Sequence, residues 1–382
     1  MKPVVSMLCC MFVPALVICQ NARTDVGGYL EYLLSTTYDS PQGNTVDQLI
    51  HARLNTKWYP TDAITGVMEL RFRGYYGGTV EHTPLFADQI KNRSGYGHLD
   101  ATVWSSTQSL GYAEVDRLYA NWAVNNVQAT VGRQRIAWGT NLVWNVIDIF
   151  NPLSVLDFDY VERPGVDAAQ VQYYTGPVSK VALAYKPETE FSKSITGFLW
   201  SLNHWDYDFH IVGGDRYGLP YGGMGWAGDI AGGGFRGEAL LSDKPAILTG
   251  AATSSKMFSG ALSGDYTFQN SFYIHTEVLY NSQGTSSNAA AFLPISQKLG
   301  LLSPARWSVF QEFSYDLSPL VRGSAFALFN PDDRSVAFVP SITWSAATNL
   351  DLMFLGLIFS GKEGAEYGGQ GKGFYLRGKW SF

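Results

Sequence analysis

Hydrophobic and polar residues alternate one for one along most of the chain. At its end, Phe374, Leu376 and Trp380 fall on one face of an extended strand, and Arg377 and Lys379 fall on the other. Side chains of a β-strand point alternately to opposite faces, so this period predicts strands with one apolar and one polar side. The same split recurs from about residue 27 onward, which makes strand the predicted structure throughout.

The alternating segments are about 10 to 13 residues long, the length of a tilted strand that crosses a bilayer. A sheet in lipid has to close, because an open edge would leave backbone groups unpaired. The pattern therefore predicts an all-β chain that forms a single transmembrane antiparallel barrel of about sixteen strands. The predicted strands are 27–38, 47–59, 64–76, 111–124, 127–138, 166–175, 178–187, 205–214, 224–240, 255–268, 271–281, 306–316, 319–329, 335–345, 349–360 and 373–382.

The connections between these strands alternate in length. Short turns such as PTD and NN are followed by long segments such as 77–110, 139–165 and 282–305. Short periplasmic turns and long outer loops are typical of outer-membrane barrels. The strand assignment is weakest over 205–240, where GGDRYGLPYGG makes a long turn on the short side and GGG suggests a bulge.

The first nineteen residues predict a cleaved signal peptide, which leaves 20–382 as the barrel domain. Lys2 supplies a positive start, and an apolar stretch of the right length follows it. A lipid anchor at Cys19 is the alternative, and the bulky Ile18 before it argues against that reading. All three cysteines lie in this segment, so no disulfide and no thiolate metal site is expected after cleavage.

Composition excludes two further classes of protein. Charged residues make up 16% of the chain, against roughly a quarter in an average soluble domain. Beyond the N-terminus no apolar run approaches the ~20 residues of a membrane helix, so a helical membrane protein is not expected. The net charge is −6 and basic residues form no block, which argues against nucleic-acid binding.

With these features the sequence resembles the outer-membrane β-barrels of Gram-negative bacteria, and its organisation is similar to that of the sixteen-stranded porins. The aromatic Phe382 at the end of an alternating strand resembles the signal that the barrel-assembly machinery recognises. The element GRQRIAWG, residues 132–139, resembles a stretch of porin-like barrels of poorly assigned function. The resemblance implies the outer membrane, its lipid and the assembly machinery as surroundings, and a homotrimer as one oligomeric state.

Charged residues on the predicted lumen face separate into two walls. The basic wall consists of Arg53, Lys57, Arg71, Arg73, Arg117, Arg133, Arg135, Arg377 and Lys379, with Glu31 and Glu69 nearby. The acidic wall consists of Asp206, Asp208, Asp265, Glu277 and Glu312, with Arg236 among them. Two walls of opposite charge predict a field across a water-filled lumen, which favours small polar solutes or ions. Alternatively the charges pair into a ladder that fills a closed barrel, although sixteen strands make a barrel too wide for that.

Two of these basic residues reach the lumen only if their strand is irregular. By strict alternation Arg133 and Arg135 share the face of Val131 and point at lipid. That placement costs about 2–4 kcal/mol for each arginine near the bilayer midplane. We therefore expect a bulge at Gly132.

The segment 140–164 is too apolar to stand in water as an outer loop, so it is expected to fold into the barrel. This segment is the third outer loop of the predicted barrel, and in porins the third outer loop forms the constriction. The resemblance implies that the acidic residues of this segment approach the basic wall. They are Asp148, Asp157, Asp159 and Glu162. The alternative is that Trp144, Phe150 and Phe158 cap the rim or contact a neighbouring subunit.

Other chemistry is weakly represented. The six histidines are scattered and no phosphate-binding or cofactor motif is present, so neither a metal nor a cofactor is expected. His275 with Glu277 and Asp265 could form a hydrolytic constellation, which keeps a barrel-embedded hydrolase open. A non-conducting barrel that serves as an adhesin, secretion partner or envelope scaffold is the third reading.

Overall fold

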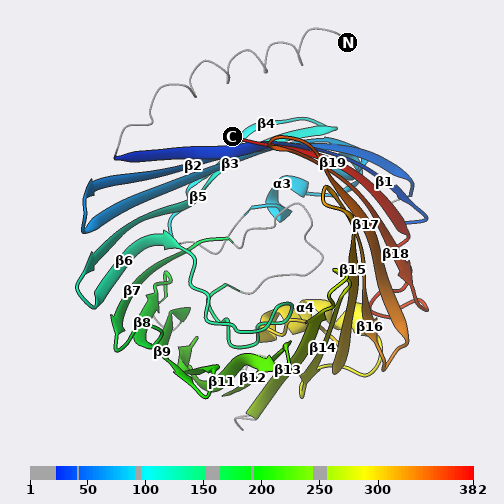
Figure 1. The fold of residues 1–382 in the computed structure, drawn as a ribbon. Coiled ribbons are helices and arrows are strands. Elements are labelled where there is room, and N and C mark those ends of the chain that lie inside the picture. The colour runs from blue at the N-terminus through cyan, green and yellow to red at the C-terminus, as the bar shows by residue number, and fades with distance from the viewer. Residues whose placement is uncertain (1–22, 41–42, 92–95, 152–163, 191–192, 244–255) are drawn as a thin grey trace.

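A computed structural model describes residues 23–40, 43–91, 96–151, 164–190, 193–243 and 256–382. The expected signal peptide 1–19 lies outside these residues. The chain forms one closed antiparallel β-barrel, in which each strand pairs with its neighbour in sequence and β19 returns to pair with β1 (Figure 1). Within the described part of the chain, no helix is long and apolar enough to span a membrane.

Eighteen strands make the barrel wall. They are β1 (Thr24–Tyr38), β2 (Thr45–Thr61), β3 (Ile64–Gly77), β5 (Ser109–Val124), β6 (Val127–Gln134), β7 (Val166–Tyr174), β8 (Lys180–Lys186), β9 (Ile195–His204), β10 (Tyr207–Arg216), β11 (Leu219–Ile230), β12 (Gly233–Asp243), β13 (Lys256–Thr267), β14 (Tyr273–Asn281), β15 (Trp307–Ser318), β16 (Val321–Asn330), β17 (Ser335–Ala347), β18 (Leu350–Ser360) and β19 (Lys372–Ser381). The connections hold the short strand β4 (Asp100–Ser105) and the helices α2 (Gly78–His82), α3 (Phe86–Gln89) and α4 (Ala289–Leu299).

Alternation places apolar side chains on the outside of the wall. On β19, for example, Phe374, Leu376 and Trp380 are 40%, 50% and 46% exposed, while Arg377 contacts Glu31 across the strand pair on the inner side. Exposed aromatic and aliphatic residues continue around the barrel, including Trp122, Leu183 and Phe258. A continuous apolar outer surface is what a lipid-facing barrel needs.

The two ends of the barrel differ as the sequence predicted. Short turns, such as Asn125–Asn126 between β5 and β6, lie at one end together with the chain closure, where the backbone of Phe382 pairs with that of Gly28. Long connections lie at the other end, called here the long-loop end. One connection at the long-loop end is short: only Tyr217 and Gly218, both at positive φ, join β10 to β11.

The prediction of sixteen strands was wrong by two. The strand β9 was missed, because its inner residues Ile195 and Leu199 and its outer residues Phe198 and Trp200 are all apolar, which removes the alternation. The predicted strand 224–240 is two strands that meet at a tight turn of Ala231 and Gly232, with φ of 55° and 86°. The GGG sequence, which was expected to form a bulge within one strand, belongs to this turn and to the start of β12.

Candidate functional site: the lumen and its inserted segment

The chain leaves the wall after β6 and enters the barrel. Figure 1 shows the residues after β6 crossing the interior toward β11–β15. Of the segment 140–164, residues 140–151 and 164 are described; Asp157, Asp159 and Glu162 lie outside the described residues. The part 140–147 is called the inserted segment below. Its position inside the barrel is defined by contacts with two wall carboxylates.

Glu238 on β12 and Glu277 on β14 accept backbone hydrogen bonds from the inserted segment. Glu238 accepts from the N–H groups of Thr140, Asn141 (2.8 Å) and Ile147 (3.0 Å). Glu277 accepts from those of Val143 (3.1 Å) and Trp144 (2.6 Å). Both carboxylates belong to fully buried residues, 2% and 0% exposed. Glu238 was not among the predicted residues, although its alternation with Arg236 would have placed it on the same inner face.

Apolar packing accompanies these hydrogen bonds. Trp138, Trp144, Ile147 and Phe150 are almost fully buried. They belong to one cluster with inward-facing residues of β7–β17, among them Val166, Ala182, Leu199, Leu240, Leu279, Phe310 and Leu328. This part of the wall thus presents an apolar cluster to the lumen, and the chain after β6 packs against it.

The other predicted acidic residues of this half lie in different surroundings. Asp265 forms an ion pair with Arg236. His275 is 2% exposed, with its Nε2 3.6 Å from Glu277 and its Nδ1 3.9 Å from Glu312. Asp208 is exposed and accepts a hydrogen bond from Asn203, and Asp206 is exposed in the β9–β10 turn.

The basic residues of β2, β3, β5 and β19 are largely paired with carboxylates. Arg53 contacts Glu69 and Asp116, the latter at 2.6 Å. Arg71 donates to Glu114, with Arg73 3.4 Å from the same oxygen. The remaining contacts are Arg117 to Glu69 at 3.4 Å, Arg377 to Glu31 at 3.8 Å, and Lys379 over the ring of Tyr29 at 4.0 Å, while Lys57 is exposed.

Two of these carboxylates, Glu114 and Asp116, were missed from the sequence. The register between β3 and β5 shifts by one residue: Glu69 pairs with Arg117, and the next residue, Leu70, pairs with Val115. Asp116 is the extra residue of this bulge, so the inward face changes phase along β5. When strict alternation is counted back along β5 from Arg117, Glu114 and Asp116 fall on the lipid face. Strict alternation therefore missed these two residues.

At Gly132 the strand β6 bends without an inserted residue. Gly132 has φ of 120°, and a Cβ there would lie 2.3 Å from the carbonyl oxygen of Leu118. The pairing with β5 and β7 nevertheless continues through Gly132 without a shift. The expected bulge is therefore absent, and a glycine-specific backbone conformation stands in its place.

Arg133 lies buried within the wall where β6 ends. Its guanidinium donates to Asp167 on β7 (2.8 Å), to the carbonyl oxygen of Val115 on β5 (3.1 Å) and to that of Gly97 (2.5 Å). It thus joins β5, β7 and the residues before β4, which pairs with the free edge of β5. Arg135, two residues on, is exposed.

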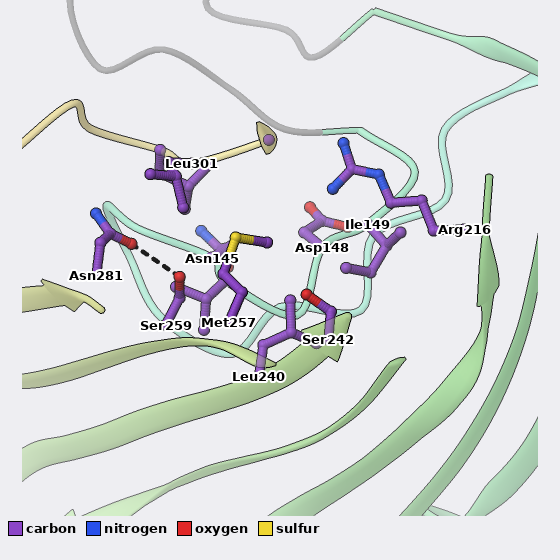
Figure 2. A pocket seen from close by; sticks show the side chains of 13 residues that line it. Asn145, Asp148, Ile149, Arg216, Leu240, Ser242, Met257, Ser259, Asn281 and Leu301 are labelled. Carbon is purple, nitrogen blue, oxygen red and sulfur yellow. Dashed lines mark hydrogen bonds between the residues drawn. The ribbon is translucent and has the colours of Figure 1, made fainter. Parts of the chain in front are cut away.

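Asp148 lines a small cavity on the long-loop side of the inserted segment (Figure 2). The cavity measures about 30 Å³ and is also lined by Asn145, Arg216, Ser259 and Asn281. Asp148 is 3% exposed, and its Oδ1 accepts a hydrogen bond from the backbone of Trp138 at 3.2 Å. A polar space of this size holds one or two water molecules.

The closed antiparallel barrel is a fold that this chain shares with solved structures of outer-membrane porins and channels. OccAB2 of Acinetobacter baumannii matches with a TM-score of 0.60 at 9% identity, over 94% of this chain and 98% of that one. The outer membrane protein OprD of Pseudomonas aeruginosa matches with 0.59 at 9% identity, over 94% of each chain. The outer membrane channel DcaP of Acinetobacter baumannii matches with 0.51 at 12% identity, over 94% and 97%. No family model matches the sequence, and no curated protein matches it either.

Proposed function

We propose that this protein is an outer-membrane channel of a Gram-negative bacterium through which small polar solutes or ions diffuse passively. The observation that carries the proposal is the division of the lumen. The chain after β6 packs against the apolar cluster of β7–β17, and charged side chains line β2, β3, β5 and β19. A barrel of this width holds more space than its own side chains fill.

The basic wall gives the channel its selectivity in this proposal. Arg71 and Arg73 lie next to each other on this wall and both contact Glu114. On the opposite wall Glu238 and Glu277 are covered by the inserted segment and Asp265 is paired. Arg71 and Arg73 are 4% and 9% exposed, so in this proposal their charges act on passing ions through the field of the wall, which favours anions, and not through direct contact. Asp157, Asp159 and Glu162 would approach this wall from the segment 140–164.

Two readings other than a channel have less support. A hydrolase built on His275 needs solvent access, yet His275 is 2% exposed and Glu277 is occupied by backbone N–H groups. A non-conducting adhesin, secretion partner or scaffold stays as the second candidate. Contacts with lipid through the apolar outer surface, insertion by the barrel-assembly machinery through Phe382, and a homotrimer belong to the proposal as well.

Purified protein in planar bilayers tests the channel directly. We expect stepwise single-channel currents, and their absence from correctly folded barrels would leave the non-conducting reading. Under a salt gradient the reversal potential should move toward cation selectivity when Arg71 and Arg73 are both changed to serine. Arg322→Ser is the matched control, because Arg322 is an exposed arginine paired with Asp316 at the short-turn end. An unchanged reversal potential in the double variant contradicts the basic wall.

A further inference from the structure

We propose that Glu238 and Glu277 are positioning residues that hold the inserted segment in the lumen and so set the free cross-section of the channel. The inference rests on the proposed function, since cross-section matters only if the barrel conducts. Neither carboxylate faces open solvent, so neither acts on a solute directly.

Glu238 fixes the shape of the segment as well as its place. Its Oε1 accepts from Thr140 and Asn141 at the start of the segment, and its Oε2 accepts from Ile147 at the end. One carboxylate therefore closes an eight-residue turn. Replacing it would release both ends of the turn at once.

Glu277 fixes the middle of the same turn. Its two oxygens accept from Val143 and Trp144, and His275 lies 3.6 Å from Oε2. Hydrogen bonds to a charged acceptor contribute about twice as much as neutral ones. The two anchors hold the start, middle and end of the inserted segment from neighbouring parts of one wall.

The segment and the carboxylates depend on each other. Without the segment, two carboxylates would face an apolar wall, and without the carboxylates five buried N–H groups would lack partners. The competing explanation is that the apolar contacts of Trp144 and Ile147 hold the segment by themselves. The two explanations make different predictions for variants that keep these apolar residues.

The test is single-channel recording of Glu238→Ala, Glu277→Ala and the double variant. Losing each carboxylate should lower the ratio of anchored to released segment by about tenfold or more, because several charge-assisted hydrogen bonds disappear. The released segment should appear as additional states of larger conductance, most frequent in the double variant. Asp316→Ala removes a wall carboxylate that contacts Arg322, and it should add no such states.

A reversible tether separates positioning from general damage. Ser263 on β13 donates to the Oδ1 of Asn141 at 3.1 Å, so Asn141→Cys with Ser263→Cys can form a bridge in a chain whose cysteines all lie before residue 20. Added to the double alanine variant, the oxidised bridge should restore the wild-type conductance, and reduction should abolish the rescue. If the alanine variants fail to assemble, Glu238→Gln with Glu277→Gln replaces them, since it removes charge at constant shape.

The possible outcomes distinguish the proposed channel from the proposed anchoring role of Glu238 and Glu277. A wild-type barrel without currents overturns the proposed channel. A conducting wild type, with alanine or glutamine variants of unchanged conductance states, overturns the anchoring role and assigns the position of the segment to apolar packing.

Discussion

The two halves of the barrel wall use opposite chemistry on their inner faces. From β7 to β17 the wall contributes an apolar cluster that packs against the chain after β6, with Leu199 and Leu279 at 1% and 0% exposure, and buried polar residues such as Glu238 and Glu277 stand among it. From β19 through β5 the inner residues are charged and pair across neighbouring strands, as Arg53 does with Glu69 and Asp116. One part is packed around an apolar cluster, and the other is lined by ion pairs. A single wall can therefore carry both a support for an inserted segment and a polar surface for solutes.

The halves meet at β6, and this seam should be the most sensitive place in the wall. Arg133→Ala removes hydrogen bonds to β5, β7 and Gly97 and leaves Asp167 without its cation. Removing one partner of a buried ion pair costs about 3–5 kcal/mol, and because the Asp167 side chain is 19% exposed, we expect the lower end of that range. We expect a large drop in the urea concentration at which half of the barrels are unfolded. The folded fraction is measured by its heat-modifiable migration in gels.

An exposed ion pair provides the control for the seam. Arg322 and Asp316 are 50% and 43% exposed in their side chains. Arg322→Ala should change the unfolding free energy by about 1 kcal/mol at most. Equal effects of the two alanine variants would mean that Arg133 does not join the halves.

The packed half should respond to a cavity as a soluble core does. Leu199→Ala removes an inner side chain of β9 from the main apolar cluster. Such a change costs about 2–5 kcal/mol, because the site collapses only in part. Leu183→Ala on the outer face of β8, where the side chain is 63% exposed, should cost much less, since lipid is as apolar as the core. Urea titrations of both variants in the same detergent decide between them.

The difference between the halves also explains what could be predicted from sequence. Alternation identified the barrel, the closing pair of β1 and β19, and most of the strands, because one apolar and one polar face can be read directly. It failed at β9, where both faces are apolar because the chain after β6 covers the inner one. It also failed at Asp116, where one extra residue changes the phase of β5.

The same limit applies to the candidate site residues, because alternation gives the face of a residue and not its contact partners. The arginines of β2 and β3 were found by their phase, and their carboxylate partners Glu114 and Asp116 were not. The apolar character of 140–164 indicated an inward fold, but nothing local showed which wall residues would receive it. Contacts such as Glu238 with Asn141 join residues about a hundred positions apart, and strand order alone does not give their distance.

A carboxylate in one of the long connections gives the smallest of these effects, a response to pH. Glu366, in the connection between β18 and β19, accepts hydrogen bonds from neutral donors, Ser303 (3.1 Å) and Asn330 (3.0 Å). Burial raises the pKa of Glu366 above its ordinary value.

A raised pKa in the folded state means that the folded protein binds the proton of Glu366 more tightly than the unfolded chain does. Its packing is therefore most stable below the ordinary glutamate pKa and weakens as the pH rises through the raised value. Proteolysis of the connection 361–371 should accelerate in the wild type as the pH rises above the ordinary glutamate pKa of about 4.3. Glu366→Gln should flatten this dependence, and Glu363→Gln, at an exposed position of the same connection, should leave it unchanged. A flat wild-type profile would mean that Glu366 stays charged beside Asn330 at every pH tested.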